Sequence, residues 1–150
     1  MAVRRVATAA PVPFAREALG RDSAAIAGLL EQLGYPSSEE QVRARLDFGP
    51  LDRRVIVAEL DRDIVGLAVL ELLHPLHKGA PEAVLTALVP DANARHRGVA
   101  RTLLADVSRR ARQAGAANLY LRTHRRRDDA HAFYRAQGFD ELHLTFDRSL

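Results

Sequence analysis

The stretch LVPDANARHRGVAR, residues 88–101, is the most informative part of the sequence, because it runs from an apolar strand through a polar loop into a helix. A helix start offers backbone N–H groups without partners inside the helix, together with the positive end of the helix dipole. Gly98 lets the backbone approach an anion closely, and Arg95, Arg97 and Arg101 add positive charge. These features predict a cradle for a pyrophosphate. Taken alone, the pattern is equally consistent with a basic loop that needs one glycine.

Apolar runs on either side of this stretch predict strands. The strands are 3–6, 55–60, 64–73, 83–89, a short strand containing Leu119 and Leu121, and a last strand containing Leu142, Leu144 and Phe146. The turn at 61–63 should join the second and third strands as a hairpin. Gly66 is expected to weaken the third strand or to mark a bulge in it.

Apolar side chains spaced for a helical face predict helices between these strands. The helices run from Asp22 or Ser23 to Leu33, from Ser37 to Leu46, from Val99 to about Gly115, and from Asp128 or Asp129 to Gly138. Asp22 or Ser23 is expected to cap the first helix, and Ser37 the second. Hairpin-connected strands come first, and strands alternating with helices follow. This order predicts an α/β (α+β) fold with a mixed sheet.

The composition fits one globular domain spanning residues 1–150. Apolar residues make up 47% of the chain, which is enough for a core, and the chain has no cysteine, so disulfides and cysteine-ligated metals are excluded. No apolar run approaches the roughly 20 residues that cross a bilayer, and the first ten residues do not read as a signal peptide. We therefore expect a cytoplasmic protein that does not associate with membranes.

The charge of the chain leaves the kind of anionic partner open. The net charge is +3, and Lys78 is the sole lysine among many arginines. Arginine binds phosphate well, which suits a nucleotide cofactor and nucleic acid alike. A nucleic-acid-binding domain is the less favoured interpretation, because no nucleic-acid motif is present and aromatic side chains for base stacking are few. Abundant arginine and alanine are also typical of a GC-rich genome.

Two motifs at a fixed separation give the informative stretch a specific interpretation. The run Arg95-His96-Arg97-Gly98-Val99-Ala100 resembles the acetyl-CoA-binding motif of the GNAT superfamily of N-acetyltransferases, Gln/Arg-x-x-Gly-x-Gly/Ala. About thirty residues later, the segment AHAFYRAQGF, residues 130–139, resembles the second motif of that family, a helix with Phe-Tyr followed by Gly-Phe. The order of the elements is similar to that of the family over nearly the whole chain.

The resemblance implies a fold and an activity. The fold is the GNAT fold, a central mixed and mostly antiparallel sheet of about six to seven strands flanked by about four helices. The activity is transfer of the acetyl group of acetyl-CoA to a primary amine of a small molecule or peptide. Dimers are common in the family, but nothing in the sequence fixes the oligomeric state.

The resemblance also implies a site. Cofactor binding falls to Leu88, Val89, Arg95, His96, Arg97, Gly98, Val99, Ala100, Arg101 and His124. Tyr134 corresponds to the general acid of the family, because a phenol held near the sulfur can donate a proton as the thiolate leaves. The backbone N–H of Leu88 or Val89 would polarise the thioester carbonyl. Pro90 has no N–H, which predicts either the loss of one cofactor hydrogen bond or an earlier divergence of the strand.

The general base is not evident from the sequence. Many relatives carry a glutamate on the strand that corresponds to residues 84–88, and that segment has no carboxylate here. The attacking amine must be neutral, whereas a lysine-type amine is mostly protonated at pH 7. Bulk water or an acceptor of low pKa would also serve, and the side chains that remain as candidates are Glu71, His74, His77, Glu82 and His124. The histidine spacings match no metal-ligand pattern, so no metal is expected.

Two functions remain compatible with the resemblance, an active N-acetyltransferase and a catalytically inactive domain that binds or senses acyl-CoA. The missing glutamate and Pro90 favour the inactive domain, whereas Tyr134 and the intact loop favour the enzyme. The resemblance implies that the acceptor lies against segments 29–48 and 74–81, which carry no concentration of carboxylates. An aminoglycoside or polyamine would favour an acidic pocket, so peptide N-termini, amino acids and other small amines remain open.

Overall fold

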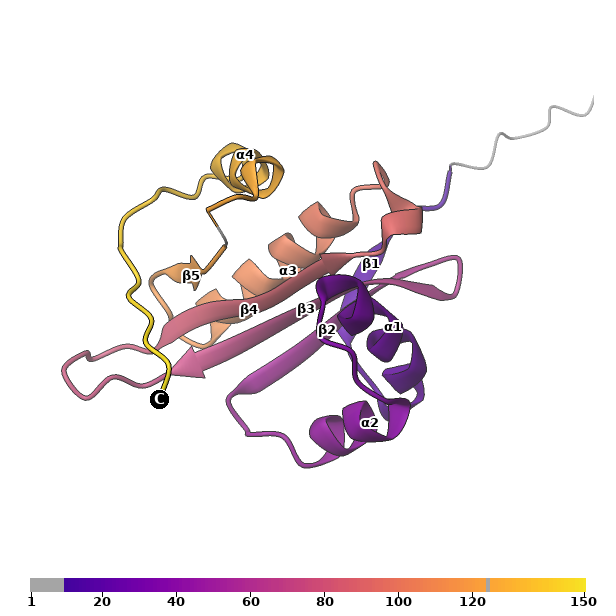
Figure 1. Cartoon of the computed structure of the whole chain (residues 1–150), viewed down its shortest axis with the longest axis horizontal. Helices are drawn as coiled ribbons and strands as arrows, with labels where there is room; N and C mark the ends of the chain where they lie inside the picture. The colour runs from indigo at the N-terminus through magenta and orange to yellow at the C-terminus, as the bar shows by residue number, and fades with distance from the viewer. Residues whose placement is uncertain (1–9, 124) are drawn as a thin grey trace, which may run out of the picture.

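The computed structural model describes residues 10–123 and 125–150, and within them a five-stranded sheet carries helices on both faces (Figure 1). The strands are β1 (Phe14–Glu17), β2 (Arg53–Leu60), β3 (Asp63–Leu73), β4 (Glu82–Pro90) and β5 (Leu119–Leu121). The helices are α1 (Ser23–Leu33), α2 (Glu39–Asp47), α3 (Val99–Gln113) and α4 (Asp128–Ala136), with two 3₁₀ turns, η1 (Gly20–Asp22) and η2 (Ala92–Ala94).

The sheet is mixed and mostly antiparallel, as the sequence predicted. Its strands follow the order β1-β2-β3-β4-β5, and only the β4–β5 pair is parallel. The β2–β3 hairpin, β4 and the short strand β5 lie close to the expected bounds. The long helix α3 is the crossover that parallel neighbours require, and it returns the chain from the end of β4 to the start of β5.

Helices α1 and α2 cover one face of the sheet, and α3 covers the other. Helices α1 and α2 pack against Val57, Leu67 and Val89 of the sheet, and α3 packs against Ala68, Leu85 and their neighbours. We call these the α1/α2 face and the α3 face. Helix α3 packs closely on Gly66 of β3, because a Cβ there would lie 2.5 Å from Val99 Cγ1. The glycine therefore permits tight helix packing next to a bulge in the β2–β3 pair.

The expected strands at the two ends of the chain differ from the structure. The strand expected at 3–6 lies outside the described residues, and the first described strand, β1, follows Pro13 instead. The last strand is wrong: residues 140–150 form no strand, and Leu142, Leu144 and Phe146 are 74%, 69% and 91% exposed. Alternating side chains make a strand only where a long partner edge exists, and β5 offers three residues. The described sheet consequently has five strands rather than six or seven.

The helix caps also differ from the expectation. Ser38, not Ser37, caps α2, and its hydroxyl accepts a hydrogen bond from the Gln41 N–H at 3.1 Å. Neither Asp22 nor Ser23 caps α1 through its side chain: the Asp22 carboxylate turns back to the Leu19 N–H at 2.7 Å. No helix of the described residues combines the length and the apolar character that a bilayer crossing needs.

Asp22 belongs to a buried ionic network that ties β1 to the start of α1. The Arg16 guanidinium donates to both Asp22 carboxylate oxygens, at 2.8 and 2.9 Å, and to Glu59 of β2 at 2.8 Å. Asp22 is 4% exposed, so its charge depends on these donors rather than on water. The hydrogen bonds from Arg16, followed in importance by the one from the Leu19 N–H, hold the pKa of Asp22 below its usual range.

Replacing Asp22 with Asn is expected to lower the free energy of unfolding by about 2 kcal/mol at pH 7, because the amide accepts at only one of the two oxygen positions, so one hydrogen bond from Arg16 is lost and its charge is no longer neutralised by Asp22. The folded-state pKa is depressed, so the contribution of the carboxylate is complete above the unfolded-state pKa of about 4 and is lost as pH falls through the folded-state pKa. Urea denaturation between pH 3 and 7 measures both effects, and the gap between wild type and variant should narrow toward pH 3.

The matched control is Glu39→Gln, which breaks the exposed ion pair with Arg43 on α2. Such pairs contribute about 1 kcal/mol or less, so its curve should follow the wild type closely. A gap between wild type and Asp22→Asn that stays constant down to pH 3 would contradict the role given to the carboxylate charge.

Candidate active site

Strands β4 and β5 diverge after a short paired segment, and this divergence opens the candidate site. Their parallel pairing ends at Leu85 and Leu121, whereas β4 continues to Pro90 against β3. The edge of β4 that would face β5 therefore carries unpaired backbone groups over the next residues. Figure 1 shows the divergence, with β4 continuing past the short β5 and α4 standing above it.

The direction of the backbone groups on this edge follows from one hydrogen bond. The Asp91 N–H donates to the Val65 carbonyl at 2.8 Å, so Asp91 points toward β3. Backbone groups alternate along an antiparallel strand, which turns the N–H of Val89 toward β3 and that of Leu88 toward the open edge. Pro90 occupies the next position that faces the open edge, and it has no N–H. Of the two donors considered from the sequence, Leu88 is the one that faces the site.

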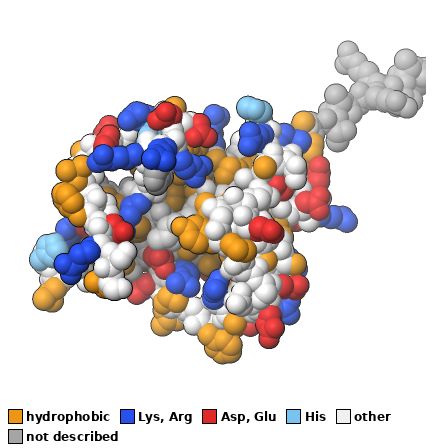
Figure 2. Space-filling view, in the orientation of Figure 1, with side chains coloured by type: hydrophobic (Ala, Val, Ile, Leu, Met, Phe, Trp, Pro, Cys, Tyr) orange, Lys and Arg blue, Asp and Glu red, His pale blue; other side chains and the backbone are white. Residues whose placement is uncertain are grey.

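A pocket of about 270 Å³ lies at this divergence. It is lined by Leu33, Tyr35, Leu85, Thr86, Ala87, Leu88, Leu121, Arg122, Thr123, Arg127 and Tyr134. These residues come from the end of α1, the open half of β4, the end of β5 and the start and middle of α4. Basic side chains gather over the segment between β5 and α4, beside a hollow in the surface (Figure 2). The pocket thus joins the α1/α2 face to the region under α4.

Tyr134 is one of two phenols in the lining of this pocket, and the other, Tyr35, is 69% exposed. The Tyr134 ring stands edge-on between Phe133 and Phe139, at centroid distances of 5.5 and 5.7 Å. The Phe139 N–H donates to the Tyr134 carbonyl at 3.0 Å, which fixes the end of α4 beneath the ring. Burial raises the pKa of Tyr134, and the nearby Arg127 charge opposes that shift only in part. The phenol is therefore protonated at neutral pH and can donate.

The loop before α3 has the features of an anion site. Gly98 precedes the helix with φ +76°, a conformation that L side chains rarely adopt, and a Cβ there would meet nothing within 4 Å. No side chain caps the first turn of α3, and that turn contains no acidic residue. The side chains of Arg95, Arg97 and Arg101 are exposed around it. Free N–H groups, the helix dipole and three cations thus converge on one open surface.

The structure separates the expected cofactor residues into groups. Leu88 lines the same pocket as Tyr134, whereas Val89 is buried with its N–H toward β3. The loop residues 95–101 lie at the start of α3 and do not line that pocket. His124 falls outside the described residues.

The candidate bases lie away from Tyr134. In the described part of the chain no carboxylate and no imidazole lines the Tyr134 pocket. Glu71 is paired with Arg53 at 3.0 Å, and His74 with Asp52 at 3.5 Å. Glu82 belongs to a different pocket, and His77 lines neither of the two. The described residues also contain no group of three or more histidine, cysteine or acidic side chains that could hold a metal ion.

Tyr35 belongs to segment 29–48, where the acceptor was expected, and it lines the pocket, whereas Thr86 was not expected there. Thr86 is the extra residue of a bulge, since Ala87 pairs with Val69 and Leu85 with Leu70. A bulge inside an apolar run leaves no mark on the sequence pattern. Tyr35 follows the left-handed Gly34 at the end of α1, and a Gly-Tyr pair after a helix indicates a turn without indicating what the tyrosine faces.

Comparison with known proteins identifies the family of the chain. The model of the acetyltransferase (GNAT) family matches residues 24–139. An aminoalkylphosphonate N-acetyltransferase of Salmonella typhimurium is 29% identical to the chain and covers 99% of it, with 98% of that protein matched.

Two solved structures share the fold. A putative acetyltransferase from Agrobacterium tumefaciens superimposes with a TM-score of 0.82 at 22% identity, covering 91% of this chain and 99% of its own. An aminoglycoside N-acetyltransferase in complex with CoA superimposes with a TM-score of 0.80 at 21% identity, covering 99% of both chains. The family model spans well over half of the chain, and the chain therefore belongs to the acetyltransferase (GNAT) family of acetyl-transferring enzymes.

Proposed function

We propose that the protein transfers the acetyl group of acetyl-CoA to a primary amine of a small molecule. The observation that carries the proposal is the open β4 edge, with the protonated Tyr134 on one side of it and the basic start of α3 at its end. A thioester with a long amide-containing arm and a pyrophosphate requires these three features together. The CoA complex of a protein with the same fold supports the choice of cosubstrate.

Each residue has a distinct task in this proposal. The N–H groups at the start of α3, together with Arg95, Arg97 and Arg101, bind the pyrophosphate. The Leu88 N–H, on the open edge of β4, donates to the amide-containing arm or to the thioester carbonyl. Pro90 removes the next donor along that edge, so the arm receives one hydrogen bond fewer than an all-amide strand would give.

The protons balance through Tyr134 and water. The neutral amine nitrogen forms a bond to the acetyl carbon, and the bond from that carbon to sulfur breaks. Tyr134 donates its phenolic proton to the departing sulfur, and the amine loses a proton to water, since the described lining holds no carboxylate or imidazole. Water then returns a proton to the phenolate. Such a site works best on an acceptor whose bound amine is neutral, and a positive charge in the pocket lowers the pKa of a bound amine.

An inactive acyl-CoA-binding domain is the second candidate, and the missing base is the observation that favours it. An enzyme without Tyr134 would still bind the cofactor, so loss of turnover in a Tyr134 variant is the result that distinguishes the enzyme from the binding domain. A domain that only senses acyl-CoA would show no turnover in the wild type either.

Isothermal titration with acetyl-CoA tests the proposal directly. We expect binding that is retained for desulfo-CoA and much weaker for AMP, because AMP lacks both the pyrophosphate and the arm. Gly98→Asp should weaken acetyl-CoA binding by about 10-fold to 100-fold, because it places a carboxylate among the groups that bind the pyrophosphate.

Gly115→Asp is the matched control for this titration. Gly115 has φ +87°, and a Cβ there also meets nothing within 4 Å, so the backbone strain is alike while the position lies at the far end of α3. Acetyl-CoA affinity should therefore be unchanged in this variant. Absence of wild-type binding would overturn both the transferase and the acyl-CoA sensor.

A further inference from the structure

The charges that line the Tyr134 pocket are both positive. The charged side chains in its lining are Arg122 and Arg127, and neither is ion-paired with a carboxylate of the described residues. Arg127 precedes α4 and lies close enough to the Tyr134 phenol to act on its pKa. Arg122 directly follows β5. The two guanidiniums therefore reach the pocket from different elements.

Arg122 extends toward the α1/α2 face of the sheet. Leu119 and Leu121 pack with the core on the α3 face, so Tyr120 between them faces the other way. Side chains alternate along an extended strand, so continuing β5 by one residue turns Arg122 to the same side as Tyr120. Tyr35, from the end of α1, lines the same pocket. The start of α3, with its basic loop, does not line this pocket, so Arg122 and the loop residues 95–101 belong to different parts of the site.

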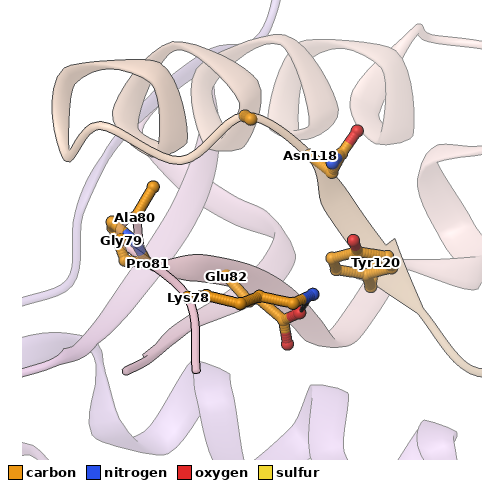
Figure 3. Close-up of a pocket in the computed structure, with 8 residues that line it drawn as sticks. Lys78, Gly79, Ala80, Pro81, Glu82, Asn118 and Tyr120 are labelled. Carbon is orange, nitrogen blue, oxygen red and sulfur yellow. Dashed lines mark hydrogen bonds and ion pairs between the residues drawn. The ribbon is translucent and has the colours of Figure 1, made fainter. Parts of the chain in front are cut away.

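The carboxylates on this part of the sheet are matched by cations of their own. Glu71 is paired with Arg53 at 3.0 Å. Glu82 is paired with Lys78 in the neighbouring pocket, where the Lys78 nitrogen lies beside the Glu82 oxygens (Figure 3). An incoming acceptor therefore meets the Arg122 guanidinium, which no described carboxylate neutralises. Glu71 and Glu82, by contrast, are each neutralised by a cation of their own.

We infer that the acceptor carries an anionic group near its amine and that Arg122 binds this group. The inference rests on the proposed function. A planar guanidinium forms paired hydrogen bonds with a phosphonate, phosphate or carboxylate, and it repels a polycation. The substrate class is thus a small amine with an oxyanion head, in which the anion holds the molecule against β5 and the amine reaches toward Leu88 and Tyr134.

Matched acceptors test the class. They are 2-aminoethylphosphonate, β-alanine, propylamine and 1,3-diaminopropane, which share a short spacer and differ in the charge of the head. We expect kcat/KM for at least one of the two anionic amines to exceed that of propylamine by about 10-fold or more, with the diamine the poorest. The first two acceptors also distinguish a phosphonate from a carboxylate as the preferred head.

Arg122→Gln tests the residue. The variant should raise KM for the anionic acceptor by about 10-fold to 100-fold, so that the preference of the protein for the anionic acceptor over propylamine falls by a similar factor. Arg122→Lys keeps the charge and loses the paired geometry. Its KM for the anionic acceptor should lie between those of the wild type and of Arg122→Gln. The control is Arg125→Gln, an exposed guanidinium of the same segment that does not line the pocket, and it should behave as the wild type.

Failure of this inference is distinguishable from failure of the proposed function. Acetyl-CoA turnover that is equal for anionic and neutral amines, or highest for the diamine, would overturn the inference and leave the transferase intact. Calorimetric binding of 2-aminoethylphosphonate and β-alanine to the CoA-saturated protein gives a second readout without turnover. If acetyl-CoA binds and neither anionic amine binds or reacts, the inference also falls. Absence of acetyl-CoA binding would overturn both the inference and the proposed function.

Discussion

Replacing Tyr134 with Phe is expected to lower kcat by about 10²-fold to 10⁴-fold, the range that general-acid catalysis contributes, and to leave acetyl-CoA affinity unchanged. The substitution removes one hydroxyl and keeps the ring, which stands between Phe133 and Phe139 at 5.5 and 5.7 Å. The packing that fixes α4 is therefore retained, and the loss falls on proton donation to the sulfur.

Release of the CoA thiol measures this effect without background, because the chain contains no cysteine to react with a thiol reagent. Tyr120→Phe is the matched control, since it removes a phenol from the neighbouring pocket and keeps the ring that lies 6.1 Å from His143. We expect wild-type turnover from the control. An unchanged kcat in Tyr134→Phe would show that the sulfur leaves without help from this phenol.

The pH dependence of turnover gives an independent check. Burial raises the pKa of Tyr134, and the acid form that can donate is present below that pKa. The wild type should therefore show no loss of kcat between pH 7 and 9 from deprotonation of Tyr134. Its kcat should instead rise with pH as more of the amine becomes neutral.

Replacing Gly66 with Val is expected to lower the free energy of unfolding by about 3 kcal/mol, the upper end of the range for overpacking a core. A Cβ at Gly66 lies 2.5 Å from Val99 Cγ1 and 2.9 Å from Leu103 Cδ1, and the Val89 carbonyl oxygen is 3.4 Å away on β4. The sheet cannot yield, because β3 lies between β2 and β4. The Val99 and Leu103 side chains must shift instead, and because both are buried in the core, we expect the first two turns of α3 to move outward with them.

The displacement should reach the cofactor, because Val99 directly follows Gly98 at the start of α3. The milder Gly66→Ala variant keeps enough stability for titration, and we expect it to weaken acetyl-CoA binding several-fold. Adding Val99→Ala removes the contacted methyl group and should restore part of both the stability and the affinity, which a double-mutant cycle measures.

Gly28→Ala is the control for Gly66, because Gly28 lies inside α1 and a Cβ there would meet nothing within 4 Å. Alanine at such a helical site is expected to stabilise by about 0.5–1 kcal/mol. Urea denaturation measures all these variants. A Gly66→Val protein as stable as the wild type would contradict the close packing of α3 on β3.

The sequence predicted the elements whose patterns are long and self-contained. The β2–β3 hairpin, β4 and α3 each have enough apolar positions to define their period, and their bounds agree with the structure to within a few residues. Strand β1 was missed because four residues are too few to show an alternating pattern. Its extended conformation depends on pairing with β2, which the sequence does not reveal. The strand expected around Leu144 was wrong for the converse reason, since its alternation is clear and its partner edge is too short.

The candidate site divides in the same way. Tyr134 and the loop through Gly98 could be predicted, because each belongs to a local motif with its own chemistry. Arg122 is close in sequence to Arg125, Arg126 and Arg127, and nothing in that run indicates which arginine lines the pocket; its relation to Tyr35 arises when the end of β5 and the end of α1 meet in space. Contacts between segments almost ninety residues apart leave no signal in a single sequence.

Pro90 has a second consequence, which concerns the colloidal behaviour of the protein. An exposed strand edge with free N–H and C=O groups is a template on which another chain can build a strand, and such growth leads to aggregates. The open half of β4 is such an edge whenever no ligand covers it. Proline at its end interrupts the ladder that an intruding strand would need. The residue that would withhold one hydrogen bond from acetyl-CoA in the proposed complex thereby also withholds it from a neighbouring molecule.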